Sequence, residues 1–313
     1  MGGIELGLSK SNIKTLWTND FDKYAHKTYK SNFKNNYLLD DIKNLSGSEL
    51  ESVDILCGGF PCQPFSIAGY QKGFNDDRGN VFFEIIRLIN ELKNKPRALL
   101  LENVKNFYTH DKGNTFRTVK DLLESNGYSV YSVILNTSEF TDIPHNRERT
   151  FLICFQDTKN HEMKTYYENF CIPEYEENTK KISEFLETDK VDEKYYYRED
   201  KYMYDDLLEV INNRDTIYQW RRIYVRENKS GVCPTLTANM GTGGHNVPLI
   251  LVDDGIRKLT PRECFNFQGF PKNFKFPQDV PNSQLYKQSG NSVTVALIEK
   301  IGKGIRETLE NFS

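Results

Sequence analysis

Two hydrophobic patterns alternate along the first half of the chain. Short apolar runs predict strands, and longer stretches with apolar residues at every third or fourth position predict helices. The predicted strands cover residues 14–20, 53–56, 98–101, 130–135 and 150–154, and the predicted helices cover residues 21–33, 81–92 and 116–123. Strands that alternate with helices predict an α/β fold built on a doubly wound parallel sheet.

The alternation ends near Pro173. An acidic, tyrosine-rich stretch follows, and β-prone runs then appear at residues 222–225 and 247–252. Residues 292–309 return to a helical pattern. This order predicts a smaller, irregular β-rich module placed before a C-terminal helix.

Composition and charge narrow the class of protein. Hydrophobic residues make up 38% and charged residues 27% of the 313 residues, and no apolar run approaches the roughly 20 residues that cross a bilayer. The six cysteines form no Cys-x-x-Cys pair, so we predict no metal site, and we expect a cytoplasmic protein. The net charge of −3 is uneven: residues 168–210 hold 14 acidic and 6 basic residues, a net of −8, which leaves +5 for the rest. A mildly basic body is compatible with a nucleic-acid partner.

A stiff turn carries the first candidate for chemistry, Cys62. The turn has the sequence Gly-Gly-Phe-Pro-Cys-Gln-Pro and follows a predicted strand. Pro61 and Pro64 fix the backbone on both sides of the cysteine. A thiol presented in this way is either a nucleophile or a small buried core residue, and the turn alone favours neither interpretation.

Acidic residues follow two other predicted strands. In a doubly wound sheet, ligands bind outside the carboxyl ends of the strands, where Asp20, Cys62 and Glu102 are all expected. Asp20 suits paired ribose hydroxyls or caps a helix. Glu102 suits proton transfer beside a cysteine that adds to an electron-poor ring, or it forms a structural salt bridge.

Two alternate arginines, Arg147 and Arg149, precede the last predicted strand of the first half. Alternate side chains of an extended segment point to one side. Guanidinium groups beside a carboxylate indicate recognition of a carbonyl or phosphate oxygen, unless the segment is a solvated turn.

Five motifs in order resemble the DNA cytosine-5 methyltransferases of bacterial restriction-modification systems. They are Gly-Gly-Phe-Pro-Cys-Gln-Pro-Phe-Ser, Glu-Asn-Val, Arg-x-Arg, the segment 257–271 and Gly-Asn-Ser-Val at 290–293. The resemblance covers nearly the whole chain. It implies an S-adenosylmethionine-dependent methyltransferase that flips a cytosine out of duplex DNA.

The resemblance assigns roles to the catalytic candidates. Cys62 adds to C6 of the cytosine, Glu102 holds or donates the proton at N3, and Arg149 contacts O2. Arg147 supports the same pocket, and Asn103 orders the loop after Glu102.

The resemblance also assigns the cofactor and DNA contacts. Residues expected to bind S-adenosylmethionine are Gly2, Gly3, Asp20, Phe21, Asp41, Pro61, Asn291 and Ser292. Residues expected to contact DNA are Gln219, Arg221, Arg222, Arg226 and Thr235.

The implied domain plan is discontinuous. It comprises a catalytic domain at 1–175, a target-recognition domain at 176–257, a hinge at 258–290 and a C-terminal helix at 291–313 that folds back onto the catalytic domain. A monomer is expected, with a cognate restriction endonuclease as a further partner.

Two positions depart from the family pattern. Members begin with an apolar strand and Phe-x-Gly-x-Gly-Gly, of which only Gly2 and Gly3 stand here, and His145 occupies a position where glutamine is usual. We expect the recorded start to be truncated; the alternatives are a strand supplied by a second polypeptide or an inactive DNA-binding homologue. A tRNA substrate is a further alternative, which the sizeable recognition module disfavours.

Overall fold

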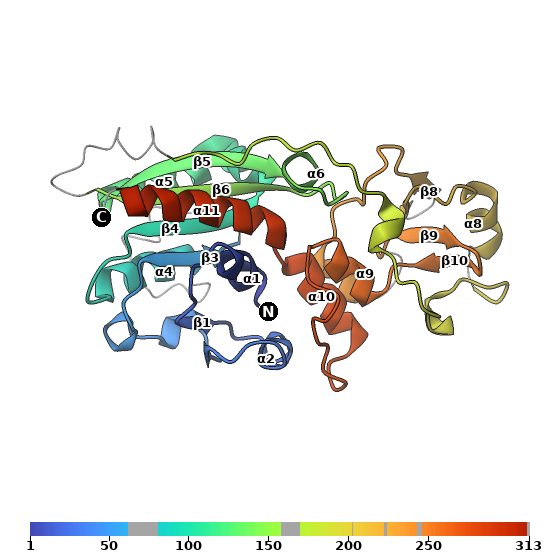
Figure 1. Ribbon diagram of the computed structural model, residues 1–313, viewed down its shortest axis with the longest axis horizontal. Helices are drawn as coiled ribbons and strands as arrows, with labels where there is room; N and C mark the ends of the chain where they lie inside the picture. Colours follow the sequence, from blue (N-terminus) through green and yellow to red (C-terminus); the bar gives the residue numbers. More distant parts are fainter. Residues whose placement is uncertain (62–80, 158–169, 202, 222–223, 243–245, 312–313) are drawn as a thin grey trace.

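A four-stranded sheet forms the centre of the larger part of the protein (Figure 1). The computed structural model describes residues 1–61, 81–157, 170–201, 203–221, 224–242 and 246–311. The strands lie in the order β3 (Ile55–Gly59), β4 (Ala98–Val104), β6 (Glu148–Gln156) and β5 (Tyr128–Asn136). All five strands and three helices predicted in the first half are confirmed, with shifted ends.

The prediction of a wholly parallel sheet was wrong. Strands β3 and β4 are parallel, but β6 is antiparallel to both of its neighbours. Only residues 137–147, which include the single-turn helix α6 (Thr137–Phe140), connect β5 to β6. A parallel pair needs a longer crossover that usually contains a full helix, whereas a short connection returns the chain antiparallel.

Helices cover both faces of this sheet because β4 is apolar on both sides. Ala98 and Leu100 pack in one cluster with α11 (Val295–Asn311), while Leu99 and Leu101 pack in another with α4 (Val81–Glu91) and α5 (Asn114–Ser125). This alternation is the period of two that a strand imposes on its side chains. The C-terminal helix α11 therefore lies against the first sheet (Figure 1).

A smaller parallel sheet lies beside the first. It consists of β1 (Trp17–Asn19) and β2 (Asn36–Leu38), which are joined through α2 (Lys23–Lys30). The carboxylate of Asp22 caps α2 by accepting hydrogen bonds from the N–H groups of its first turn. Helix α1 (Gly3–Lys10) packs on α11.

A third, antiparallel sheet occupies the other end of the molecule (Figure 1). Its strands lie in the order β10 (Gly255–Lys258), β9 (Leu249–Val252), β7 (Tyr218–Arg221) and β8 (Tyr224–Glu227). The predicted strands at 222–225 and 247–252 correspond to β8 and β9, whereas β7 and β10 were missed. The described residues also form the α-helices α8 (Tyr204–Val210), α9 (Pro261–Asn266) and α10 (Asn282–Asn291), and short 3-10 helices at Ile42–Asn44, Gly47–Glu49, Lys105–Tyr108, His110–Gly113, Ile182–Phe185, Glu193–Tyr195 and Ala238–Thr242.

Within the described ranges, no helix has the length and apolar character to cross a membrane. The same ranges contain no group of three or more His, Cys, Asp or Glu side chains arranged to hold a metal ion.

Gly290 allows α10 to approach the segment between β8 and β9 very closely. A Cβ atom at this position would lie 2.1 Å from the backbone carbon of Thr237 and 2.4 Å from the nitrogen of Ala238. We expect Gly290→Ala to lower the free energy of unfolding by about 1–3 kcal/mol, since backbone rather than a flexible side chain must move. Urea unfolding measures the change.

Gly58→Ala is the matched control for this substitution. Its Cβ would come no closer than 3.6 Å to the nearest atom, in the side chain of Ile85. The control should be neutral or should stabilise the protein by up to about 1 kcal/mol. Equal losses in both variants would contradict the close-packing explanation.

Candidate active site

The carboxyl ends of β3 and β4 lie side by side, as the sequence predicted. Gly59 is the register partner of Glu102, and the Phe60 N–H donates to the Glu102 carbonyl oxygen at 3.4 Å. Pro61 is exposed and is the last described residue before Cys62, which lies outside the described residues. The turn that carries Cys62 therefore begins next to Glu102.

Glu102 forms an ion pair with Arg149 across the sheet. The distance between Arg149 Nε and Glu102 Oε1 is 2.9 Å, and the two side chains are 14% and 18% exposed, respectively. Strand β4 supplies the glutamate and the antiparallel strand β6 supplies the arginine. The structure thus brings together two of the predicted catalytic residues in a partly buried position.

Asn103 connects the end of β4 to the turn before Cys62. Its side-chain nitrogen donates to the Phe60 carbonyl oxygen at 2.9 Å, and its side-chain oxygen Oδ1 accepts from the Val104 N–H at 2.8 Å. The side chain is buried. Asn103 therefore fixes the chain on both sides of the site, including the residue two positions before the predicted nucleophile.

Arg147 faces the protein's own backbone. It is 2% exposed and donates to the carbonyl oxygens of Leu236 at 3.0 Å, Gly290 at 3.2 Å and Ser292. Burial lowers the pKa of Arg147 to about 9, and the charge of Arg149 acts in the same direction. The alternation of the two arginines gave no sign of this difference, in which Arg149 pairs with the carboxylate and Arg147 contacts two distant segments, at Leu236 and at Gly290 and Ser292.

Two predicted cofactor residues, Gly3 and Ser292, lie together. A Cβ at Gly3 would come within 2.7 Å of the Ser292 hydroxyl oxygen, so glycine is needed where α1 meets the segment after α10. Gly2 precedes α1 with a φ of 97°, and a Cβ there would overlap the ring of Phe33. Both glycines thus permit close packing at the start of α1.

Three further predicted cofactor residues, Asp20, Phe21 and Asp41, follow β1 and β2. Asp20 follows β1 and accepts a hydrogen bond from the Asp22 N–H at 3.0 Å, so it forms a turn next to the residue that caps α2. Phe21 is 76% exposed, although it is a large apolar residue. Asp41 lies after β2 and accepts from the Lys43 N–H at 3.1 Å.

An ion pair brings α10 to this same region. Lys287 Nζ lies 2.9 Å from the carboxylate of Asp22, which adjoins Asp20 and Phe21. Asn291 is exposed and ends α10 one turn later. The sequence gave no signal for this contact, because the two charges are separated by 265 positions.

The predicted DNA contacts fall into two groups. Gln219, Arg221 and Arg226 lie on the paired strands β7 and β8, where Gln219 is the register partner of Arg226 and accepts from the Arg221 guanidinium at 3.0 Å. Thr235 lies elsewhere, and its hydroxyl donates to the Asn146 carbonyl oxygen at 2.6 Å. Arg222 lies outside the described residues.

Asn136, at the end of β5, is a supporting residue that the sequence analysis missed. Its side-chain oxygen accepts from the Arg147 N–H at 3.0 Å, and its amide donates to Asn146 Oδ1 at 2.9 Å. Asn136 therefore shapes the segment that leads into the two arginines. Nothing in the sequence pattern distinguishes it from other asparagines at strand ends.

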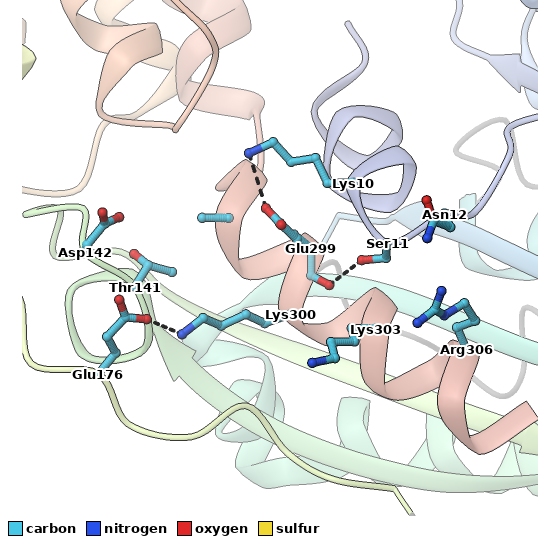
Figure 2. A pocket seen from close by; sticks show the side chains of 11 residues that line it. Lys10, Ser11, Asn12, Thr141, Asp142, Glu176, Glu299, Lys300, Lys303 and Arg306 are labelled. Atoms are coloured by element: carbon cyan, nitrogen blue, oxygen red, sulfur yellow. Dashed lines mark hydrogen bonds and ion pairs between the residues drawn. The ribbon is translucent and has the colours of Figure 1, made fainter. Parts of the chain in front are cut away.

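A separate hollow of about 320 Å³ lies along α11 (Figure 2). Four of its charged side chains pair with one another: Lys10 lies 3.2 Å from Glu299, and Lys300 pairs with Glu176. Ser11 also donates to the Glu299 carbonyl oxygen at 2.6 Å. None of the predicted site residues lines this hollow, and its paired charges give no reason to assign it a ligand.

Known proteins are similar to this chain over nearly its whole length. A model of the family described as C-5 cytosine-specific DNA methylase matches residues 1–307. Type II methyltransferase M.Bsp6I of Bacillus sp. (strain RFL6) is 49% identical over 313 residues, which cover 99% of this chain and 96% of that protein. Type II methyltransferase M.HhaI of Haemophilus parahaemolyticus is 36% identical over 322 residues, which cover 99% and 92%.

The fold is also similar to solved structures. The Dnmt2 methyltransferase of S. pombe superimposes with a TM-score of 0.72 at 19% identity, over 100% of this chain and 96% of that one. At this identity the similarity concerns the fold alone. It agrees with a methyltransferase fold that contains a mixed sheet.

Proposed function

Because the chain belongs to the C-5 cytosine-specific DNA methylase family, we propose that it methylates one cytosine within a short duplex DNA site and protects host DNA in a restriction-modification system. The enzyme is a DNA (cytosine-5-)-methyltransferase. The observation that carries the proposal is the Glu102–Arg149 pair, which stands beside the turn that leads to Cys62.

The proposed mechanism divides the work among three side chains. The Cys62 thiolate adds to C6 of a flipped cytosine, and the new S–C6 bond moves electron density toward C5. Glu102 holds or donates the proton at N3, so the ring does not accumulate negative charge. Arg149, held by its ion pair with Glu102, donates to O2 of the base. After C5 has taken the methyl group, a water molecule removes the C5 proton, the electron pair of that C–H bond re-forms the C5–C6 double bond, and the S–C6 bond breaks, which restores the thiolate.

The family uses S-adenosylmethionine, which supplies the methyl group when bound. The end of β1 fits such a cofactor, since the exposed ring of Phe21 can stack on adenine and the Asp20 carboxylate can accept from ribose hydroxyls. We assign Asp41 and Pro61, and Asn291 and Ser292 from the end of α10, to the same pocket, together with the backbone of Gly2 and Gly3.

Phe21→Ala tests the cofactor assignment. Loss of the stacking surface should raise the KM for S-adenosylmethionine by about three- to tenfold, the equivalent of one aromatic stacking interaction, while kcat changes little. Tyr175→Ala is the control, because Tyr175 is 70% exposed and lies outside the proposed pocket. Initial rates at varied cofactor concentration give the KM and kcat of both variants. An unchanged KM in Phe21→Ala would contradict the assignment of Phe21 to the cofactor pocket.

The sheet of β7–β10 is the centre of the proposed target-recognition domain at 176–257. Arg221, Arg226 and Gln219 on β7 and β8 are the proposed contacts to DNA, together with Arg222, which follows Arg221 in the sequence. Phosphate contacts position a protein on DNA, and base contacts specify the sequence.

We assign residues 258–290 to the hinge and residues 1–175 with 291–313 to the catalytic domain. We expect a cytoplasmic monomer, with a cognate restriction endonuclease that acts on the same DNA site.

Incubation of the purified chain with S-adenosylmethionine labelled in the methyl group tests the proposal. Label should enter unmethylated duplex DNA as 5-methylcytosine, and fully methylated duplex should accept none. Binding to DNA without transfer, or transfer to tRNA only, would overturn the assignment. Methylation-sensitive sequencing of the labelled DNA then identifies the target site.

A further inference from the structure

Two short segments far apart in the sequence run side by side near the proposed site. Residues 144–147 and residues 233–236, together called the seam, are joined by backbone hydrogen bonds from Cys233 N–H to the Pro144 carbonyl at 2.6 Å and from Asn146 N–H to the Cys233 carbonyl at 2.7 Å. The first segment continues into β6 and Arg149, and the second carries Thr235.

His145 lies at the centre of the seam and is fully buried. Its Nδ1 lies 2.9 Å from the Phe267 carbonyl oxygen, and its Nε2 lies 3.3 Å from the Leu236 nitrogen. A carbonyl can only accept and a backbone N–H can only donate, so Nδ1 carries the hydrogen and Nε2 is bare. The two contacts together require a neutral ring.

The surrounding charges also oppose protonation of this ring. Burial holds the pKa of His145 well below its usual value, and the charges of Arg147 and Arg149 act in the same direction, against a smaller opposing effect of the Phe267 carbonyl. The neighbouring core contributes the thiols of Cys233 and Cys264. The carboxylate of Glu263, whose charge acts on Cys233, is already bound by both terminal nitrogens of Arg257, at 2.6 and 2.7 Å.

Arg147 reinforces the contact that His145 makes. Its guanidinium donates to the Leu236 carbonyl oxygen, while the ring of His145 accepts from the N–H of the same residue. Residues 145 and 147 therefore hold both polar groups of one residue of the seam. A proton on Nε2 would face the Leu236 N–H and break the hydrogen bond between the ring of His145 and Leu236.

We propose that neutral His145 is a positioning residue for methyl transfer, which fixes the seam so that Thr235 and Arg149 hold a set distance, and that protonation of the ring releases the seam. The proposal rests on the proposed function, in which the two residues meet DNA and the flipped base. A glutamine side chain at this position can supply one donor and one acceptor without titrating.

The test compares the full-length protein with His145→Gln and His145→Ala between pH 8 and pH 5, by urea unfolding and by the kcat and KM for duplex DNA. The unfolded chain binds a proton on this histidine near pH 6.5, whereas the folded protein does so only at lower pH, so stability is lost as the pH falls. In the wild type, each pH unit below about 6.5 should lower the folding equilibrium constant by up to tenfold relative to His145→Gln until the folded ring itself binds a proton, and the KM should rise only in that lower pH range.

The variants separate a positioning role from a purely structural one. His145→Gln should keep the wild-type kcat and KM at pH 8 within about threefold and lose the acid-dependent rise in KM, while His145→Ala should raise the KM by about tenfold at every pH because two backbone groups lose their partner. Equal pH profiles for the wild type and His145→Gln would overturn the proposal. The unfolding comparison remains decisive if the enzyme transfers no methyl group or if His145→Ala does not fold.

Discussion

Cys62→Ser is expected to lower methyl transfer to duplex DNA by at least about a thousandfold. A thiolate is the attacking species in the proposed mechanism, and a serine hydroxyl in the same turn is not ionised near neutral pH. Transfer of labelled methyl groups under single-turnover conditions measures the loss directly, independently of product release.

Cys171→Ser provides the matched control, because Cys171 is exposed and belongs to no proposed site. It should transfer methyl groups at the wild-type rate. Cys62→Ser should still bind duplex DNA, so retained binding with lost transfer separates a chemical defect from misfolding. Turnover by Cys62→Ser within tenfold of the wild type would contradict the assignment of this residue.

Glu102→Gln is expected to lower kcat by about 10²–10⁴, the range that a positioned acid or base contributes. The amide keeps the shape of the side chain but cannot transfer a proton, and it removes the ionic partner of Arg149, which lies 2.9 Å away. The side chain of Glu102 is 18% exposed, and the glutamine amide that replaces it can still form hydrogen bonds. We therefore expect a folded protein with a nearly unchanged KM for DNA.

The control for this substitution is Glu307→Gln on the outer surface of α11. Its carboxylate lies 3.9 Å from Lys303 Nζ and is 47% exposed, so its loss should leave kcat unchanged. If Glu102→Gln retained full kcat while the pH profile stayed the same, the Glu102–Arg149 pair would be a structural salt bridge only.

The sequence predicted the positions of the strands better than their directions. The apolar run at Ala98–Leu101 correctly indicated a strand buried on both faces. This placed Glu102 at the carboxyl end of that strand. The direction of β6 could not be predicted, because side chains alternate with the same period in parallel and antiparallel strands. Only the short connection from β5 carried that information.

The roles of the two arginines illustrate a second limit of sequence reasoning. Their spacing indicated that Arg147 and Arg149 face one side, but the partners of Arg147 are carbonyl groups at positions 236, 290 and 292, which no local pattern brings together. The burial of His145 was unpredictable for the same reason. Long-range packing, rather than local propensity, decides which polar residues contact substrate and which hold the protein together.

Covalent trapping on duplex DNA that carries 5-fluorocytosine at the target position tests the central claim most directly. A fluorine at C5 cannot leave as a proton does, so the S–C6 bond to Cys62 should persist after methyl transfer. With S-adenosylmethionine present, the wild type should give a protein–DNA species that survives denaturing electrophoresis, and Cys62→Ser should give none. A folded wild-type protein that binds both the cofactor and this DNA yet forms no such species would contradict the assignment of Cys62 as the nucleophile.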